Sequence, residues 1–183
     1  MGRDKVTLEV AGEALLDRAI GRLSGVAAPV ILAGGDRTPA RPGCLSVPDP
    51  IPDRGPLGGL VAALRASPHP LCAVVGVDMP GLSGALLARM AAAWAGEDAL
   101  VPLAEGRPQP LHAVYCRSSL GVAEDALAGA DLSLRHLLTR LRVRFVDAAA
   151  VLGGSLPPEW AANLDTPDDL RRWLARAAAP ATR

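Results

Sequence analysis

The residue best placed for chemistry is an aspartate at the end of an apolar run. Residues 71–77 are apolar almost throughout, which predicts a buried parallel strand, and Asp78 follows directly. Ligands bind at the carboxyl ends of strands in such sheets. A carboxylate there is costly to bury alone, and a hard cation such as Mg²⁺ is a natural partner. Asp78 could instead only begin a turn before Pro80, but the preceding strand favours a ligand role.

Two further signals concern phosphate. Gly55-Pro-Leu-Gly-Gly59 stands just ahead of a predicted helix at residues 60–66, so its backbone can approach a ligand and free helix N–H groups can meet anionic or carbonyl oxygens. Lys5 stands three residues after Gly2, at the end of a possible glycine loop, and can place a positive charge on phosphates. The alternatives are ordinary, since glycines ahead of a helix often only form a turn and a lone lysine near an N-terminus is often solvated.

Two oxygen-bearing side chains precede the last predicted helix. Asn163 and Asp165 alternate onto one side of an extended segment, so both could present oxygens to one ion. They could also only shape the turn into the helix, which is the reading we favour for Asn163. Thr166 is a good N-cap, and Pro167 suits the first helical position.

The elements that must position these residues indicate an α/β fold. Strands alternating with helices favour a layered structure with a mostly parallel sheet flanked by helices. Residues 36–59 are rich in proline and glycine and predict one long loop. The other predicted elements are strands at residues 28–33, 99–103, 111–115 and 143–146, and helices at residues 15–23, 83–94, 120–127, 134–141 and from 167 onward.

Composition excludes several classes of protein. A length of 183 residues favours one domain, and 19 basic against 19 acidic residues leave no broad positive field for nucleic acid. No apolar run reaches the roughly 18 residues that span a bilayer, so we expect no membrane partner. The three cysteines are far apart in the sequence and form no Cys-x-x-Cys pair, which favours a reducing cytoplasm. We expect each cysteine to serve as a small apolar residue that fills space in the core.

Taken jointly, five segments resemble one family. They are Gly2-Arg-Asp-Lys5, Gly55-Pro-Leu-Gly-Gly59, Val77-Asp-Met-Pro80, Pro110-Leu-His-Ala-Val-Tyr115 and Asn163-Leu-Asp-Thr-Pro-Asp-Asp-Leu170. Their order and spacing resemble the molybdenum cofactor guanylyltransferases, which have a Rossmann-like nucleotidyltransferase fold, and the resemblance covers nearly the whole chain. Gly-Pro-Leu-Gly-Gly favours this family over its cytidylyl-transferring relatives.

The resemblance implies a reaction and roles for individual residues. GTP and molybdopterin-bound molybdenum would give the guanine dinucleotide form of the cofactor and pyrophosphate, with molybdenum-insertion proteins or molybdoenzyme chaperones as further partners. Lys5 and Asp78 match catalytic residues of the family, and Asp78 also matches its Mg²⁺ ligand. The residues that match nucleotide-binding positions are Lys5, Ala33, Asp49, Gly55, Pro56, Leu57, Gly58 and Asp78.

The sequence departs from the family pattern in two places. The family begins with an apolar strand and a Leu-Ala-Gly-Gly loop, whereas this sequence begins at the end of that loop. We therefore expect a single nucleotidyltransferase domain over residues 1–183 that lacks its first strand, the strand being encoded upstream of a misplaced start. Ile31-Leu-Ala-Gly-Gly35 contains the same Leu-Ala-Gly-Gly sequence, but it falls where the family has its second strand and so does not match the first loop. Asp165 stands where the family has a second asparagine, and whether it binds metal stays open.

Two rival functions stay open. One is another nucleotidyltransferase, which transfers a cytidylyl group or acts on a sugar or lactyl phosphate. The other is a non-catalytic remnant or binding module, because a missing central strand would leave two unpaired sheet edges.

Overall fold

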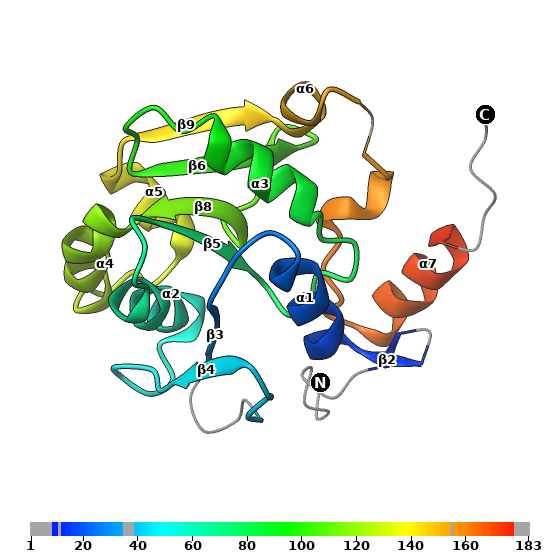
Figure 1. Cartoon of the computed structure of the whole chain (residues 1–183), viewed down its shortest axis with the longest axis horizontal. Helices are drawn as coiled ribbons and strands as arrows, with labels where there is room; N and C mark the ends of the chain where they lie inside the picture. The colour runs from blue at the N-terminus through cyan, green and yellow to red at the C-terminus, as the bar shows by residue number, and fades with distance from the viewer. Residues whose placement is uncertain (1–8, 11, 35–38, 155, 178–183) are drawn as a thin grey trace.

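A central layer of strands lies between two groups of helices (Figure 1). A computed structural model covers the 183 residues, and the structure describes residues 9–10, 12–34, 39–154 and 156–177. None of the helices described is both long and apolar enough to cross a membrane.

The described strands form two sheets and one small hairpin. In the main sheet, β5 (Leu71–Val75) pairs β8 (His112–Cys116), β8 pairs β6 (Ala99–Ala104), and β6 also pairs β7 (Arg107–Pro108) and β9 (Val143–Asp147). The second sheet contains only β3 (Val30–Ala33) and β4 (Cys44–Val47), which run parallel. The hairpin joins β1 (Glu9–Val10) to β2 (Glu13–Ala14).

The predicted α/β architecture is confirmed, but two strands of the main sheet, β7 and β8, run antiparallel to β6. β6 and β9 are parallel, whereas β8 runs antiparallel between β5 and β6. Glu105 and Gly106, which join β6 to β7, both have positive φ, as a two-residue hairpin turn requires. The short connection reverses the chain, so the main sheet is mixed. The expected parallel arrangement holds for the β6–β9 and β3–β4 pairs.

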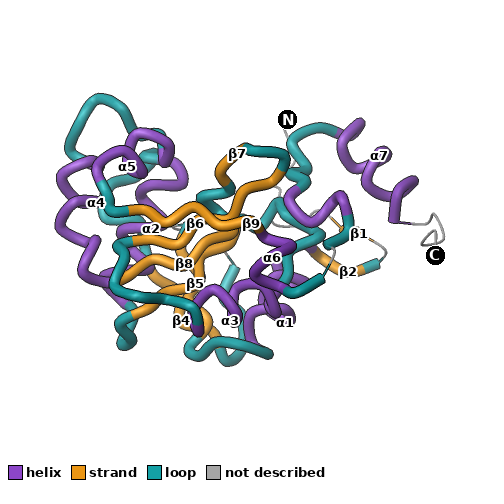
Figure 2. The backbone as a smooth tube through the Cα atoms, turned by 90° about the horizontal axis from the view of Figure 1, so that it is seen from above, coloured by secondary structure: helices purple, strands orange, loops and turns teal. Residues whose placement is uncertain are grey.

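The helices cover both faces of the main sheet. Their bounds are α1 Leu15–Ser24, α2 Gly55–Ala66, α3 Gly84–Ala92, α4 Leu120–Leu127, α5 Leu134–Arg140, α6 Ala148–Leu152 and α7 Pro167–Ala177, with 3-10 turns at Arg117–Ser119 and Pro158–Ala161. α2, α4 and α5 pack on one face with Val101, while α3 and α6 pack on the other with Leu100 (Figure 2). Alternate side chains of β6 therefore enter two different cores.

The prediction of one continuous loop over residues 36–59 is wrong in two respects. It contains β4, and α2 begins at Gly55 rather than near residue 60. β4 has only four residues, too few for a periodic signal, and its pairing with β3 is a long-range contact that local sequence does not report. Pro56, in the first turn, is compatible with a helix start, so the glycines belong to the helix itself.

The predicted start of the last helix is confirmed. Thr166 Oγ1 accepts a hydrogen bond from the Asp169 amide at 3.1 Å, and Asp169 Oδ2 accepts one from the Thr166 amide at 2.7 Å. This reciprocal pair satisfies two amides that have no partner within the helix. The predicted role of Thr166 as the N-cap of this helix is therefore confirmed.

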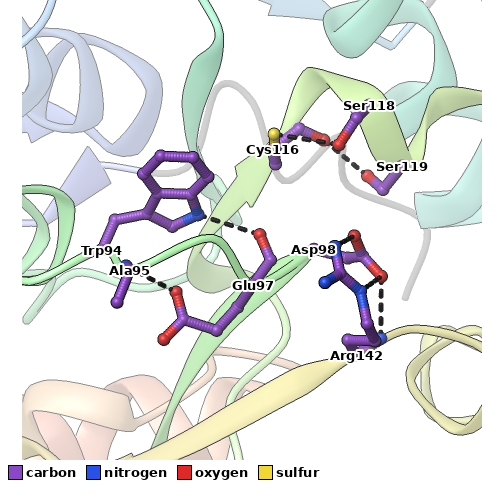
Figure 3. Close-up of polar contacts among 8 residues, drawn as sticks. All are labelled: Trp94, Ala95, Glu97, Asp98, Cys116, Ser118, Ser119 and Arg142. Atoms are coloured by element: carbon purple, nitrogen blue, oxygen red, sulfur yellow. Dashed lines mark hydrogen bonds and ion pairs between the residues drawn. The ribbon is translucent and has the colours of Figure 1, made fainter.

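A polar network braces the amino ends of β6 and β9 (Figure 3). Asp98 binds the Arg142 guanidinium through Nη2 at 2.8 Å and accepts a hydrogen bond from the Arg142 amide at 2.9 Å. The carbonyl of Asp98 also accepts from the Cys116 amide at 2.8 Å, at the end of β8. Asp78 follows the carboxyl end of β5, whereas this network lies at the amino ends of β6 and β9. The network is therefore distant from Asp78.

Candidate active site

A cleft of about 740 Å³ lies between β3 and β5. α1 closes one face of it, where Leu16 packs on Val30 and Leu32. α2 closes the other, where a Cβ on Gly59 would lie 3.7 Å from the Cβ of Ala33. Successive side chains of a strand point to opposite faces, so the two helices lie on opposite sides of β3. The volume is within the usual range for small-molecule sites, about 300–1,000 Å³.

The open end of the cleft lies at the carboxyl ends of the strands. α2 begins beside the end of β3 and finishes at Ala66, after which β5 begins at Leu71. β5 therefore runs in the same direction as β3, as in a βαβ unit. We call this end the cleft mouth. Its lining residues are Gly34, Pro48, Asp49, Pro52, Asp53, Gly55, Pro56 and Asp78.

Deeper in the cleft, the walls include the edge of β5. The carbonyl of Leu111 accepts from the Gly76 amide at 2.8 Å, and that of Pro70 accepts from the Arg117 amide at 2.7 Å. Backbone groups alternate sides along an antiparallel strand, so those of Ala73 and Val75 face the cleft. No described strand pairs with this edge of β5. β5 is consequently half-buried along its whole length, whereas β8, with neighbours on both sides, is fully buried.

Asp78 is half-buried and lines the cleft mouth, as the sequence predicts. Its backbone is held from two directions. The Gly76 amide bonds to β8 as above, and the Asp78 carbonyl accepts from the Leu164 amide at 2.9 Å. Two residues further on, the Pro80 carbonyl accepts from Arg18 Nε at 2.9 Å. Three other parts of the chain, at Leu111, Leu164 and Arg18, thus fix the segment that carries this aspartate.

A buried histidine contacts the segment that follows Asp78, at Ser83. His112 is fully buried on β8, its Nε2 lies 3.3 Å from the Ser83 amide, and its ring meets Trp160 edge to face at 5.1 Å between centroids. Burial lowers the pKa of His112 from 6.5 to about 4, although the backbone hydrogen bond to Ser83 opposes the shift. The imidazole is therefore neutral near pH 7. The sequence places His112 in a family motif but assigns it no role.

Asp49 also reaches the cleft mouth. Its Oδ1 is buried and has no hydrogen-bond partner among the described residues, and burial raises the pKa of this carboxyl group. The carboxyl carbon would lie 3.6 Å from a Cβ placed on Gly58, so Asp49 packs against the first turn of α2. A buried acceptor without a partner carries a desolvation cost that a ligand donor would remove.

The predicted Gly55–Gly59 segment divides between the cleft and the core. Gly55 and Pro56 line the mouth, and Gly55 has a φ of 61°, which favours glycine. Gly58 is buried against Asp49 and is not itself a cleft-lining residue. Leu57 is fully buried in the core with α4 and α5. The Leu57 side chain therefore faces away from the mouth, which leaves only its backbone for a nucleotide contact.

The remaining predicted site residues fall in different places. Ala33 ends β3 and lines the cleft, and its contact with a nucleotide stays a prediction. Lys5 lies outside the described residues. Asn163 and Asp165 are exposed and do not line the cleft, although they flank Leu164, which contacts the Asp78 carbonyl.

The structure adds Asp53 to the mouth, a residue that the sequence analysis missed. Asp53 has a φ of 58°, in the left-handed region, two residues ahead of the left-handed Gly55. An aspartate close before a Gly-Pro pair is a turn signal that could have indicated this position.

The described lining of the mouth is acidic. Asp49, Asp53 and Asp78 belong to it, and no described lining residue is Lys or Arg. These acids do not gather closely enough to form a metal site of three protein ligands within the described part of the chain. Mg²⁺ is commonly held by one or two carboxylates together with substrate phosphates and waters, so a half-buried Asp78 at the mouth fits such an ion.

Known proteins similar to this chain belong to one family of nucleotidyltransferases. The model of the MobA-like NTP transferase domain matches residues 1–145. A probable molybdenum cofactor guanylyltransferase from Pelotomaculum thermopropionicum is 34% identical over 171 residues, which cover 93% of this chain and 83% of the relative. One from Chloroflexus aggregans is 35% identical, with 93% and 85% covered.

The chain belongs to the molybdenum cofactor guanylyltransferase family. The resemblance predicted from the five sequence segments is thereby confirmed, as is the nucleotidyltransferase class. Among solved structures, the molybdopterin-guanine dinucleotide biosynthesis protein A of Archaeoglobus fulgidus superposes with a TM-score of 0.79 at 24% identity, covering 97% of this chain and 92% of the other. A cytidylyltransferase from Thermus thermophilus gives 0.68 at 21% identity, covering 96% and 94%. These two likenesses confirm the nucleotidyltransferase fold.

Proposed function

We propose that this member of the guanylyltransferase family transfers GMP from GTP to molybdopterin-bound molybdenum, giving the guanine dinucleotide cofactor and pyrophosphate. The observation that carries the proposal is the cleft mouth. There Asp49, Gly55 and Asp78 line the cleft at the carboxyl ends of two strands, and Ala33 lines it at the end of β3.

Asp49 is proposed to contact the nucleotide. Its buried Oδ1 has no partner among the described residues, so an N–H or O–H donor of the nucleotide would supply the missing hydrogen bond. Binding would also lower the raised pKa of this group, since a donor stabilises the ionised form.

The phosphates are proposed to lie near the first turn of α2. Arg54 is the N-cap of this helix, and because a guanidinium has no acceptor, its side chain cannot satisfy the first amides of α2. Asp53 and Gly55 have positive φ on either side of Arg54, and backbone N–H groups in such alternating turns converge on anions. The Leu57 and Gly58 contributions would be backbone amides, and Lys5 would add the positive charge that the described lining lacks.

Asp78 is proposed to hold Mg²⁺. A bound Mg²⁺ would neutralise part of the negative charge that GTP brings beside the three acids of the mouth. The role of the chain is to hold the segment that carries Asp78 in place. The Gly76 amide donates to the Leu111 carbonyl, and the Asp78 carbonyl accepts from the Leu164 amide.

The reaction needs little covalent chemistry from the protein. A terminal phosphate oxygen of molybdopterin attacks the α-phosphorus of GTP in line, a new P–O bond forms, and the bond to the bridging oxygen breaks. Pyrophosphate leaves with that electron pair. The attacking oxygen is already anionic, so no general base is required. Rate enhancement would come from orientation and charge neutralisation.

The proposal is tested first by nucleotide selection. Calorimetry with Mg²⁺ should show GTP bound more tightly than CTP or ATP, and Asp49→Asn should weaken GTP binding because a neutral amide is a poorer acceptor. Pyrophosphate release should then require molybdopterin-bound molybdenum. A preference for CTP would assign the chain to the cytidylyl branch, and a protein that binds no nucleotide would match the remnant.

We also propose that residues 1–183 belong to one nucleotidyltransferase domain whose sheet is completed by a further strand in the deep part of the cleft. The backbone groups of Ala73 and Val75 face that space, and α1 and α2 cover its two faces. A strand covered on both faces needs an apolar sequence.

A short apolar strand fused ahead of Met1 through a flexible linker should slow amide exchange at Ala73 and Val75 and raise the midpoint of thermal unfolding. A fusion of the same length with aspartate at every second strand position should do neither. Equal exchange in the two fusions would contradict the proposal.

The reaction is proposed to take place in the cytoplasm, because the described cysteines are all free thiols. Proteins that insert molybdenum and chaperones of molybdoenzymes are the proposed partners that deliver the substrate and receive the product. Affinity capture with the wild-type chain, and with Asp78→Asn as a control for an inactive site, would test those partners.

A further inference from the structure

One guanidinium on α1 contacts the segment that carries Asp78 and the helix that follows Asp165. Arg18 is partly buried, with its side chain 22% exposed. Its Nε donates to the Pro80 carbonyl at 2.9 Å, and its Nη1 donates to Glu13 Oε2 at 3.4 Å. The central carbon of the guanidinium lies 5.6 Å from the centroid of the Trp173 ring on α7.

These contacts place Arg18 at a junction of three segments. Pro80 lies two residues after Asp78, and Trp173 belongs to the helix that follows Asp165. The same two segments meet again where the Leu164 amide donates to the Asp78 carbonyl at 2.9 Å. The Asp78 segment is therefore connected to the segment before α7 directly through Leu164 and indirectly through Arg18.

The kind of side chain matters at this junction. An arginine presents donors in a rigid planar fork and can lie over an aromatic ring while its edge donates hydrogen bonds. A lysine carries the same charge but has one compact ammonium group, so it cannot direct a donor to Pro80 and face Trp173 with the same geometry. Arg22, one turn further along α1, is exposed and provides a matched comparison.

We infer that Arg18 is a positioning residue, which fixes the Asp78 segment against α7 and thereby sets where the Asp78 carboxylate stands in the cleft mouth. The effect on nucleotide binding rests on the proposed function. The effect on the backbone does not, because it follows from the Pro80 contact alone. Arg18 does not line the cleft and is not a candidate for contact with substrate.

The first test is amide hydrogen exchange of the full chain without ligand. Arg18→Lys should speed exchange of the Leu164 amide by about tenfold, the order expected for loss of a charge-assisted hydrogen bond. Leu82, whose amide bonds to Met79 in the same segment, should follow it. Arg22→Lys should leave both amides unchanged.

The second test is titration with GTP and Mg²⁺ under conditions where every variant is folded. Wild type and Arg22→Lys should bind equally, and Arg18→Lys should bind about tenfold more weakly. If wild type fails to bind, the proposed function is wrong and the exchange result alone decides the role of Arg18. If Arg18→Lys exchanges like wild type, or binds GTP like wild type while only its global stability falls, Arg18 is an ordinary structural residue and the inference is overturned.

Discussion

Replacing the buried histidine should change how the stability of this protein depends on pH. Burial lowers the pKa of His112 to about 4, while an unfolded chain titrates near 6.5. The unfolded state therefore binds a proton more readily than the folded state. The stabilising contribution is fully present above pH 6.5 and is lost as the pH falls from 6.5 towards 4.

The size of the effect follows from the shift. The fall from 6.5 to about 4 corresponds to about 3 kcal/mol of unfolding free energy lost between pH 7 and pH 4. His112→Phe removes the titrating group and keeps an aromatic ring of similar size beside Trp160. It should cost about 1 kcal/mol at pH 7, because the hydrogen bond to Ser83 is lost.

Urea unfolding of wild type and His112→Phe from pH 7 to pH 4 provides the assay. Carboxyl groups titrate in both proteins, so the difference between the two curves isolates His112. Wild type should lose about 3 kcal/mol more than the variant over this range. His69→Gln, which changes an exposed histidine, should follow wild type. Parallel losses in wild type and His112→Phe would refute the assignment of a buried neutral imidazole.

Three other substitutions test the site and its support. Asp78→Asn should lower kcat by a large factor and leave apo stability nearly unchanged, because it removes the charge proposed to hold Mg²⁺; an unchanged kcat would exclude Asp78 from the site. Gly81→Ala should cost about 1–3 kcal/mol in denaturant unfolding, since its Cβ would lie 2.5 Å from the Glu159 carbonyl oxygen. Gly21 is an exposed position of α1 where an added Cβ would have no neighbouring atom within 4 Å, so Gly21→Ala should instead stabilise by about 0.5–1 kcal/mol. A loss of stability there would show that this face of α1 has no room for a methyl group.

Local sequence determined those features that depend on neighbouring residues. The apolar run before Asp78 forms β5, and Asp78 lines the cleft mouth directly after it. Thr166 caps the start of α7 with the expected hydrogen bond. Hydrophobic spacing and end signals report these elements because the contacts that form them lie within a few residues. The family could likewise be predicted from five short segments, since their order and spacing are properties of the chain itself.

Only the tertiary structure decided which distant segments meet. β4 inside a predicted loop, the antiparallel β8, the burial of Leu57 and the junction at Arg18 all depend on contacts between residues far apart in sequence. A periodic pattern shows that a residue is buried but not which surface covers it. The Leu57 side chain faces the α4–α5 core rather than the cleft for this reason, because the helical rotation within α2 turns it away while leaving Gly55 and Pro56 at the mouth.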